Sequence, residues 1–226
     1  MDGFVYISVF ASVIISGMAV LAITIQPKAL KLILAFSGAY LFAITVLHLI
    51  PEIYSSGNNW VGIFILAGFF AQILLEFFSE GIEHGHVHVH PHETAFPAAM
   101  MIALSLHSFM EGMPLAKNFQ NEAVNQLLIG IILHNIPIAI ALMSMLLQSG
   151  IKKQNAVFWL VVFALMTPLG TLTGNLIGQN IAGNISEYSN TIMAVVVGIF
   201  LHISTTILFE SSEHHRFNLI KFITII

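Results

Sequence analysis

Two apolar segments of the chain each contain a histidine near their centre: Leu106-His107-Ser108-Phe109-Met110-Glu111-Gly112 and Leu133-His134-Asn135-Ile136-Pro137. A side chain that can bind a metal is costly to hold in the middle of an apolar helix, so it usually has a functional role there. His107 and Glu111 are four residues apart and therefore share one helix face. The two segments together predict the two halves of one site inside a membrane.

The composition of the chain is that of a membrane protein. Of the 226 residues, 57% are hydrophobic and 8% are charged, whereas a soluble domain has about 25% charged residues. The absence of cysteine excludes disulfides and thiolate metal sites. Seven scattered basic residues are too few for a nucleic-acid-binding surface. We therefore expect an all-α integral membrane protein whose residues 1–226 form one transmembrane domain in contact with lipids.

Seven segments are apolar enough to cross a bilayer, which takes about 20 residues of helix. They are residues 4–25, 30–50, 59–79, 95–116, 123–147, 156–178 and 190–210. An eighth segment begins near Phe217, but the chain stops at Ile226, and about ten residues of helix rise only about 15 Å. We therefore expect the eighth helix to be truncated in this chain.

The basic residues predict the orientation of these segments. One side of the membrane receives all but Lys117, namely Lys28, Lys31, Lys152, Lys153, Arg216 and Lys221. The positive-inside rule then places the N-terminus outside and the loop at residues 80–94 in the cytoplasm. This loop contains His84, His86, His88, His90 and His92. Neutral imidazoles in such a tract can bind a divalent metal, and a solvated linker is the alternative interpretation.

Two prolines follow the central histidines closely. Pro114 and Pro137 each remove one backbone hydrogen bond, so we expect both helices to kink and to leave a carbonyl group unpaired near the site. Imidazole, carboxylate and carbonyl groups together suit zinc and similar divalent ions. For either histidine alone, a hydrogen bond across a helix interface is the alternative.

These motifs resemble the signature of the ZIP (Zrt/Irt-like protein) family of divalent metal transporters. HSFMEG at 107–112 and HNIPIA at 134–139 are similar to its fourth- and fifth-helix motifs, His-Asn/Ser-x-x-Asp/Glu-Gly and His/Gln-Glu/Asp/Lys-x-Pro-Glu-Gly. LHLIPE at 47–52 and MTPLG at 166–170 are similar to the HLLPE ending of the second helix and to TP-x-G in the sixth. The histidine-rich loop is also typical, and the resemblance covers nearly the whole chain.

The resemblance implies an eight-helix bundle in a 3+2+3 arrangement, with helices four and five at the centre, and it suggests a homodimer. His107, Glu111 and His134 match the family's primary metal ligands, while Ser108 and Asn135 match positions that bind a second metal in some members. Many members have a second glutamate where this chain has Ile138, and Asn135 is neutral where they have an acidic residue. We therefore expect a centre for one metal, in a transporter that is weaker or more permissive than members with both acidic residues.

Other polar residues outline a possible pathway for the metal. His48 and Glu52 stand at the outer end of the second segment, where they can gather metal or simply mark a helix end. His202 and Glu210 in the seventh segment can form an exit toward the histidine-rich loop, or serve as an interface residue and a solvated helix end. Glu76, near the inner end of the third segment, is expected to be solvated.

The function that these features predict is movement of a divalent cation into the cytoplasm, with zinc first and manganese, iron or cadmium as alternatives. The short loops favour a bacterial inner membrane. An intramembrane metal-dependent hydrolase is one rival, but its His-Glu-x-x-His motif is absent. A metal sensor that binds the ion without moving it is the other. We therefore expect a transporter and not an enzyme.

Overall fold

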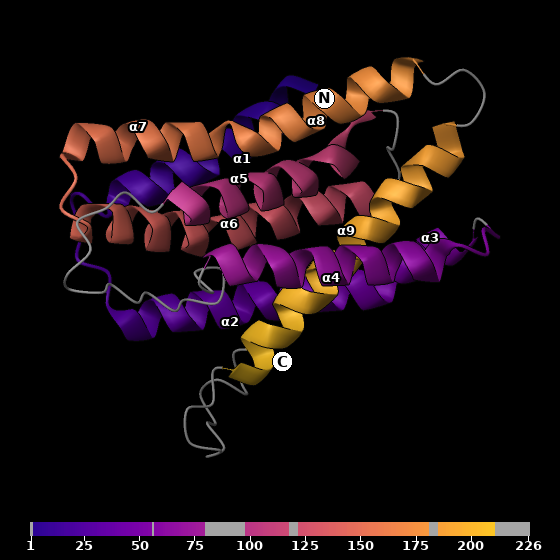
Figure 1. Cartoon of the computed structure of the whole chain (residues 1–226), viewed down its shortest axis with the longest axis horizontal. Coiled ribbons are helices and arrows are strands. Elements are labelled where there is room, and N and C mark those ends of the chain that lie inside the picture. Colours follow the sequence, from indigo (N-terminus) through magenta and orange to yellow (C-terminus); the bar gives the residue numbers. More distant parts are fainter. Residues whose placement is uncertain (1, 56, 80–97, 118–121, 181–184, 211–226) are drawn as a thin grey trace.

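The computed structural model describes residues 2–55, 57–79, 98–117, 122–180 and 185–210, and this part of the chain is helical, with no strand (Figure 1). In chain order the α-helices are α1 (Asp2–Ala19), α2 (Pro27–Ile44), α3 (Ile50–Ser55), α4 (Val61–Ser79), α5 (Ala98–Gly112), α6 (Glu122–Gln148), α7 (Lys153–Ala164), α8 (Met166–Asn180) and α9 (Ile185–Glu210). A π-helical turn, Thr45–Leu49, joins α2 to α3, and a 3-10 turn, Met113–Leu115, follows α5.

Each of the seven predicted segments overlaps a helix or helices joined end to end, although α1 ends at Ala19 and not near residue 25. Within the part of the chain that the structure describes, five helical stretches are long and apolar enough to cross a membrane: Pro27–Ser55, Val61–Phe78, Val124–Gln148, Lys153–Gln179 and Glu187–Leu208. The apolar helix Gly3–Ala19 is shorter, and α5 has only 15 residues. The predicted eighth helix and the histidine-rich loop lie outside the described residues, so the 3+2+3 arrangement stays a prediction.

Two prolines affect the helices differently from the prediction. The second helix does not end at Pro51 but continues to Ser55. The π turn before it, in which the Ile50 N–H bonds to the Thr45 carbonyl, widens the helix, and the missing N–H of proline is tolerated next to such a turn. A kink was predicted at Pro114, but α5 ends before it, at Gly112, and the chain continues as a 3-10 turn that contains Pro114.

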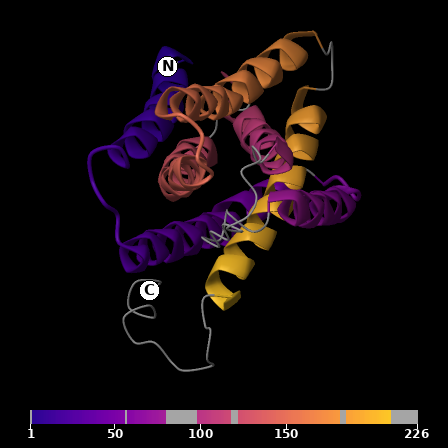
Figure 2. The same cartoon turned by 60° about the vertical axis from the view of Figure 1, so that its left-hand side comes forward.

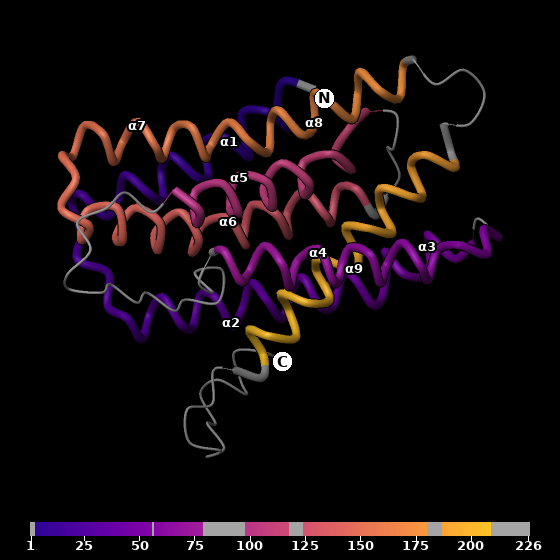
Figure 3. The backbone as a smooth tube through the Cα atoms, viewed as in Figure 1, coloured from indigo at the N-terminus to yellow at the C-terminus, as the bar shows by residue number. Residues whose placement is uncertain are grey.

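The helix α6 is the central element of the bundle. Its membrane-length stretch is the most buried of the five, and it packs against α1, α2 and α7. In Figure 2, which looks nearly along α6, the other helices surround it. α7 and α8 continue in one direction across the bundle, while α9 crosses the other helices obliquely and packs along α4 and α2 (Figures 1 and 3). Pro137 lies inside α6, and the helix continues on both sides of it.

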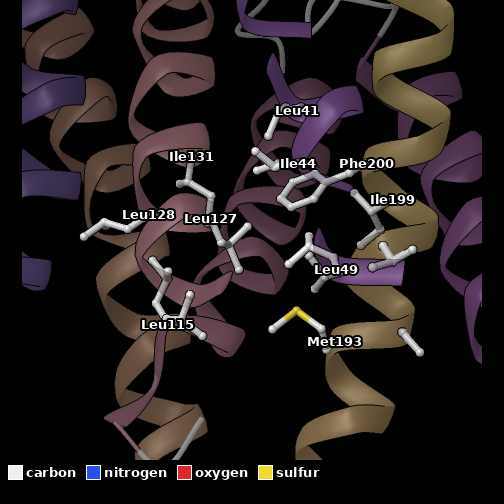
Figure 4. Packing of buried hydrophobic residues seen from close by; sticks show 14 of the residues in the cluster. Leu41, Ile44, Leu49, Leu115, Leu127, Leu128, Ile131, Met193, Ile199 and Phe200 are labelled. Atoms are coloured by element: carbon white, nitrogen blue, oxygen red, sulfur yellow. The ribbon is translucent and has the colours of Figure 1, made fainter. Parts of the chain in front are cut away.

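The buried apolar side chains form two separate cores that share α6. The first core contains Leu127 and Ile131 of α6 together with residues of α2 and α9, and Figure 4 shows side chains of this core gathered between the helices. The second core contains Ile138 and Leu142 of α6 together with residues of α1, α5 and α7. His134 stands on α6 between Ile131 of the first core and Ile138 of the second.

The outer surface of the bundle is apolar, as a lipid-facing surface must be. Along α4 the exposed side chains Ile63, Leu66, Phe70, Leu74 and Phe77 recur every three or four residues, so they line one face of the helix. Phe77 is 78% exposed. A soluble monomer rarely exposes a continuous apolar face of this kind, so the surface agrees with the membrane location predicted from composition.

Glycines hold two pairs of helices in backbone contact. A Cβ atom added at Gly170 of α8 would lie 1.9 Å from the Phe109 carbonyl oxygen of α5, and one at Gly112 would lie 2.1 Å from the Thr167 carbonyl oxygen. Gly68 of α4 and Gly198 of α9 are equally close to the facing backbone. Small residues permit this approach because no side chain stands between the helices. The backbones of α5 and α6 stay further apart, and the side chains of the candidate site fill the space between them.

The variant Gly170→Ala should unfold at a clearly lower temperature than the native chain. Its methyl group cannot fit 1.9 Å from a backbone oxygen, so α5 and α8 must separate. We expect a loss of at least about 2 kcal/mol, or about 4–8 °C in melting temperature, followed in detergent by tryptophan fluorescence. Gly62→Ala is the matched control, because a Cβ atom there meets only the Tyr54 hydroxyl at 3.6 Å. Equal melting of the two variants would contradict the close packing of α5 and α8.

Candidate metal centre

Three candidate ligands meet in the interior of the bundle, between α5 and α6. His107 and Glu111 lie one turn apart on α5, and His134 lies on α6. All three are fully buried. One possible ligand atom from each residue lies within 4.8 Å of the others, and within the described ranges no other group of three or more such residues does so. The structure thus brings together the three side chains that the sequence singles out as a set.

The centre lies at mid-depth in the bundle. His134 follows Glu122, the first residue of α6, by twelve positions, which corresponds to a rise of about 18 Å along a helix about 40 Å long. Along α6, Leu127 and Ile131 of the first core precede His134, and Ile138 and Leu142 of the second core follow it. Apolar packing therefore flanks the polar cluster on both sides along this helix.

The distances within the centre suit a tetrahedral metal ion. The Nε2 atom of His107 is 2.9 Å from Glu111 Oε1, and the Nε2 atom of His134 is 4.0 Å from the same oxygen. Around zinc, with bonds of about 2.0–2.1 Å, neighbouring ligand atoms stand about 3.3 Å apart. The two distances bracket this value, so small side-chain movements suffice for all three residues to bind one ion. Three protein ligands also leave a fourth position for water or a carbonyl oxygen.

The carboxylate of Glu111 is buried without the hydrogen bonds that such a group usually has. Its Oε1 atom is close to His107 Nε2, but the pair lacks hydrogen-bonding geometry, and neither carboxylate oxygen has a hydrogen-bond partner among the described residues. Buried carboxylates normally have several hydrogen-bond partners or a cation, because desolvation is costly. His107 Nε2 and Glu111 Oε1 therefore face each other without a hydrogen bond. A cation bound by both atoms would stabilise this arrangement.

A fourth residue, Gln72 of α4, contacts the centre from outside. Its Oε1 atom is 3.0 Å from Nδ1 of His107, and the side chain is fully buried. Because a carbonyl oxygen only accepts hydrogen bonds, Nδ1 is the donor, and Nε2 then keeps its lone pair toward Glu111. Gln72 is not among the residues predicted from the sequence. Its signal was an amide side chain in the otherwise apolar stretch Val61–Leu75.

Comparison with known proteins decides the family of the chain. The family model described as ZIP Zinc transporter matches residues 83–226, which is more than half of the chain. The chain belongs to the ZIP family. The resemblance inferred from the two histidine motifs is thereby confirmed.

Several ZIP relatives are similar to this chain over different lengths. Zinc transporter ZIP1 of Danio rerio is 36% identical over 87 residues, which cover 38% of this chain and 29% of the relative. Protein zntD of Dictyostelium discoideum is 29% identical over 152 residues, which cover 62% of this chain and 22% of that protein. Zinc transporter ZIP1 of Mus musculus is 24% identical over 222 residues, which cover 78% of this chain and 68% of that protein. This chain therefore spans less than a third of the first two relatives.

The two residues that match a second metal position in some ZIP proteins have different surroundings here. The hydroxyl group of Ser108 is 2.7 Å from that of Thr167 on α8. Asn135 is fully buried, and neither atom of its amide group has a hydrogen-bond partner among the described residues. Thr171 of α8 donates to the Gly112 carbonyl oxygen. The printed partner of Ser108 on α8 is therefore a neutral hydroxyl group, and α8 contains no acidic residue.

The residues predicted to form the metal pathway either stand outside the ligand cluster or are not described by the structure. His48, on the π turn, and Glu52 of α3 are exposed, and neither belongs to the cluster of ligands. Glu210 is the last residue of α9, and the position of its side chain is not described. The five histidines at 84–92 lie outside the described residues. The roles predicted for all these residues in this ZIP protein stay predictions.

His202 of α9 has a partner that the sequence did not predict. Its Nε2 atom forms a hydrogen bond and ion pair with Glu76 Oε2 of α4, and its ring packs edge-on against Phe69 at a centroid distance of 5.0 Å. The expectation that Glu76 is solvated was wrong, since its side chain is only 21% exposed. The oblique path of α9 across α4 is what places the two residues together.

Proposed function

We propose that this protein moves a divalent cation, zinc first, across a membrane through the centre formed by His107, Glu111 and His134. The observation that supports this most directly is the burial of three metal-binding side chains at mid-depth, between two apolar cores. The relatives named as zinc transporters and the ZIP family match agree with it. Manganese, iron and cadmium are alternative substrates of the same centre.

The ligand chemistry supports a borderline divalent ion. Two imidazoles and one carboxylate are common ligands of zinc, whereas calcium and magnesium favour oxygen ligands throughout. Glu111 contributes the only negative charge of the centre, so a bound dication keeps a net charge of about +1. Such a site binds the dehydrated ion but does not neutralise it, which favours release of the cargo. A second ion beside Ser108 and Asn135 is not expected, because no carboxylate there would balance its charge.

The direction of movement is proposed from the distribution of basic residues. The positive-inside rule places the N-terminus outside and residues 80–94 in the cytoplasm. The metal would then enter past His48 and Glu52, bind at the centre, and leave by way of His202 and Glu210 toward the histidine-rich loop. The plasma membrane, a bacterial inner membrane in particular, is the proposed location, and a homodimer is the proposed assembly.

Two rival functions use the same ligands. A metal-dependent hydrolase needs a general base next to a metal-bound water, and Glu111 is already proposed as a ligand. The ZIP1 relatives of this chain are named as zinc transporters. A metal sensor would bind the ion at the centre without moving it. Only measured flux separates the sensor from the transporter.

The first test is uptake of ⁶⁵Zn²⁺ into proteoliposomes at pH 7 and pH 5, with the same pH on both sides of the membrane. Ligand histidines must be neutral to bind metal, so protons compete with the ion for the imidazoles as the pH falls. We therefore expect saturable uptake to be lower at pH 5 than at pH 7. Uptake that is equal at both values would contradict histidine ligation. Metal binding in detergent without uptake at either pH would favour the sensor.

A further inference from the structure

α4 presents two polar side chains to neighbouring helices, one turn apart. Gln72 contacts His107 of α5, and Glu76 contacts His202 of α9. One turn earlier on the same face, Gly68 lies against the Val195 backbone of α9, where an added Cβ atom would stand 1.9 Å from the carbonyl oxygen. The backbone that bears Gln72 is therefore firmly packed against α9, and Gln72 reaches the centre from a fixed position.

The contact between Gln72 and His107 determines which ring nitrogen can bind a metal. With Nδ1 donating to Gln72 Oε1 at 3.0 Å, the proton is placed on the nitrogen that points away from Glu111. The lone pair of Nε2 is then directed to the space shared with Glu111 and His134. In the other tautomer Nε2 would have a proton, and His107 could not bind an ion there.

We propose that Gln72 is a positioning residue for the metal substrate: it selects the tautomer and the ring orientation in which His107 binds the ion. This inference rests on the proposed function, because it assigns Gln72 a role in the same centre. Outer groups that orient a ligand histidine typically change metal affinity about 10–100-fold when they are removed. A glutamine that only joins α4 to α5 would have no such effect.

The neutrality of the glutamine amide is part of this role. A carboxylate at position 72 would also accept the Nδ1 proton, but it would add a second negative charge and cancel the charge left by a bound dication. The ion would then bind more tightly and leave more slowly. A glutamine orients the histidine without slowing the release of the ion, and a transporter has to release its ion.

The test compares the native protein with Gln72→Met and Gln72→Glu in detergent, with Gln148→Met as the control for an exposed glutamine at the end of α6. Zinc affinity is measured by titration calorimetry, and the tautomer of His107 in the metal-free protein by ¹⁵N NMR of labelled histidine. We expect Gln72→Met to bind zinc about 10–100-fold more weakly and to lose the Nδ1–H signature. Gln72→Glu should keep the signature and bind at least as tightly as the native protein.

The outcomes separate this inference from the proposed function. Native affinity in Gln72→Met, or an equal loss in Gln72→Met and Gln72→Glu, would overturn the positioning role while leaving the centre intact. If the native protein binds no zinc, the proposed function fails. The NMR signature of the metal-free protein then still tests the bond between Gln72 and His107, and its absence in the native protein would overturn that bond by itself.

Discussion

Replacing His107 by alanine is expected to abolish saturable ⁶⁵Zn²⁺ uptake into proteoliposomes. The substitution removes one of three protein ligands, and it leaves the buried Gln72 oxygen without the imidazole that donates to it. Two remaining ligands do not make a dehydrated site for a dication in a low-dielectric interior. We expect zinc affinity in detergent to fall at least about 100-fold, because a ligand should matter more than the groups that orient it.

The control for this variant is Leu106→Ala. Leu106 precedes His107 on α5, but its side chain is 49% exposed on the outer surface, so its removal should leave uptake near the native level. Thermal unfolding of metal-free protein shows whether His107→Ala is folded. A folded His107→Ala variant with native uptake would show that the metal takes another route through the protein.

Replacing Glu111 by glutamine should have opposite effects on metal binding and on the metal-free protein. The variant removes the single negative charge of the centre, so zinc affinity should fall at least about 100-fold and uptake should be lost. In the metal-free protein the buried carboxylate has no hydrogen-bond partner among the described residues, so replacing it by a neutral amide removes the desolvation cost of an unpaired buried charge. We therefore expect the metal-free variant to melt at a temperature no lower than that of the native protein.

The measurement is a pair of melting curves with and without zinc, together with uptake. The native protein should be stabilised by zinc through binding to the folded state, and Glu111→Gln should not. Glu187→Gln is the matched control, since it makes the same chemical change at an exposed position in the first turn of α9. Zinc-induced stabilisation that persists in Glu111→Gln would exclude Glu111 from the ligand set.

The part of the candidate site that depends only on local helix geometry could be predicted from the sequence. His107 and Glu111 share a face because they are four residues apart on a helix, and this relation does not depend on what packs nearby. His134 required one further step, that α5 and α6 meet at the level of their histidines. The two consecutive apolar segments, each with a histidine near its centre, suggested this step, and the family resemblance supported it.

Other features were not predictable because they depend on the rotation and tilt of whole helices. Gln72 lies 35 positions before His107, and Glu76 lies 126 positions before His202. Nothing in the spacing of these residues indicates their contacts, which follow from the path of α4 between α5 and α9. The helix through Pro51 is a similar case. A proline after an apolar segment predicts a helix end, and only the π turn at Thr45–Leu49 allows the helix to continue.

The sequence by itself determined that this protein has the composition of a membrane protein, where its apolar helices run, and that His107 and Glu111 share one helix face. These properties follow from composition and from the 3.6-residue period of the helix, both of which are local. The tertiary structure decided which helices touch. The glycine contacts of α5 with α8 and of α4 with α9 set how closely the helices approach. That approach in turn places Gln72 against His107 and His202 against Glu76, because a side chain reaches only the helix that packing brings beside it.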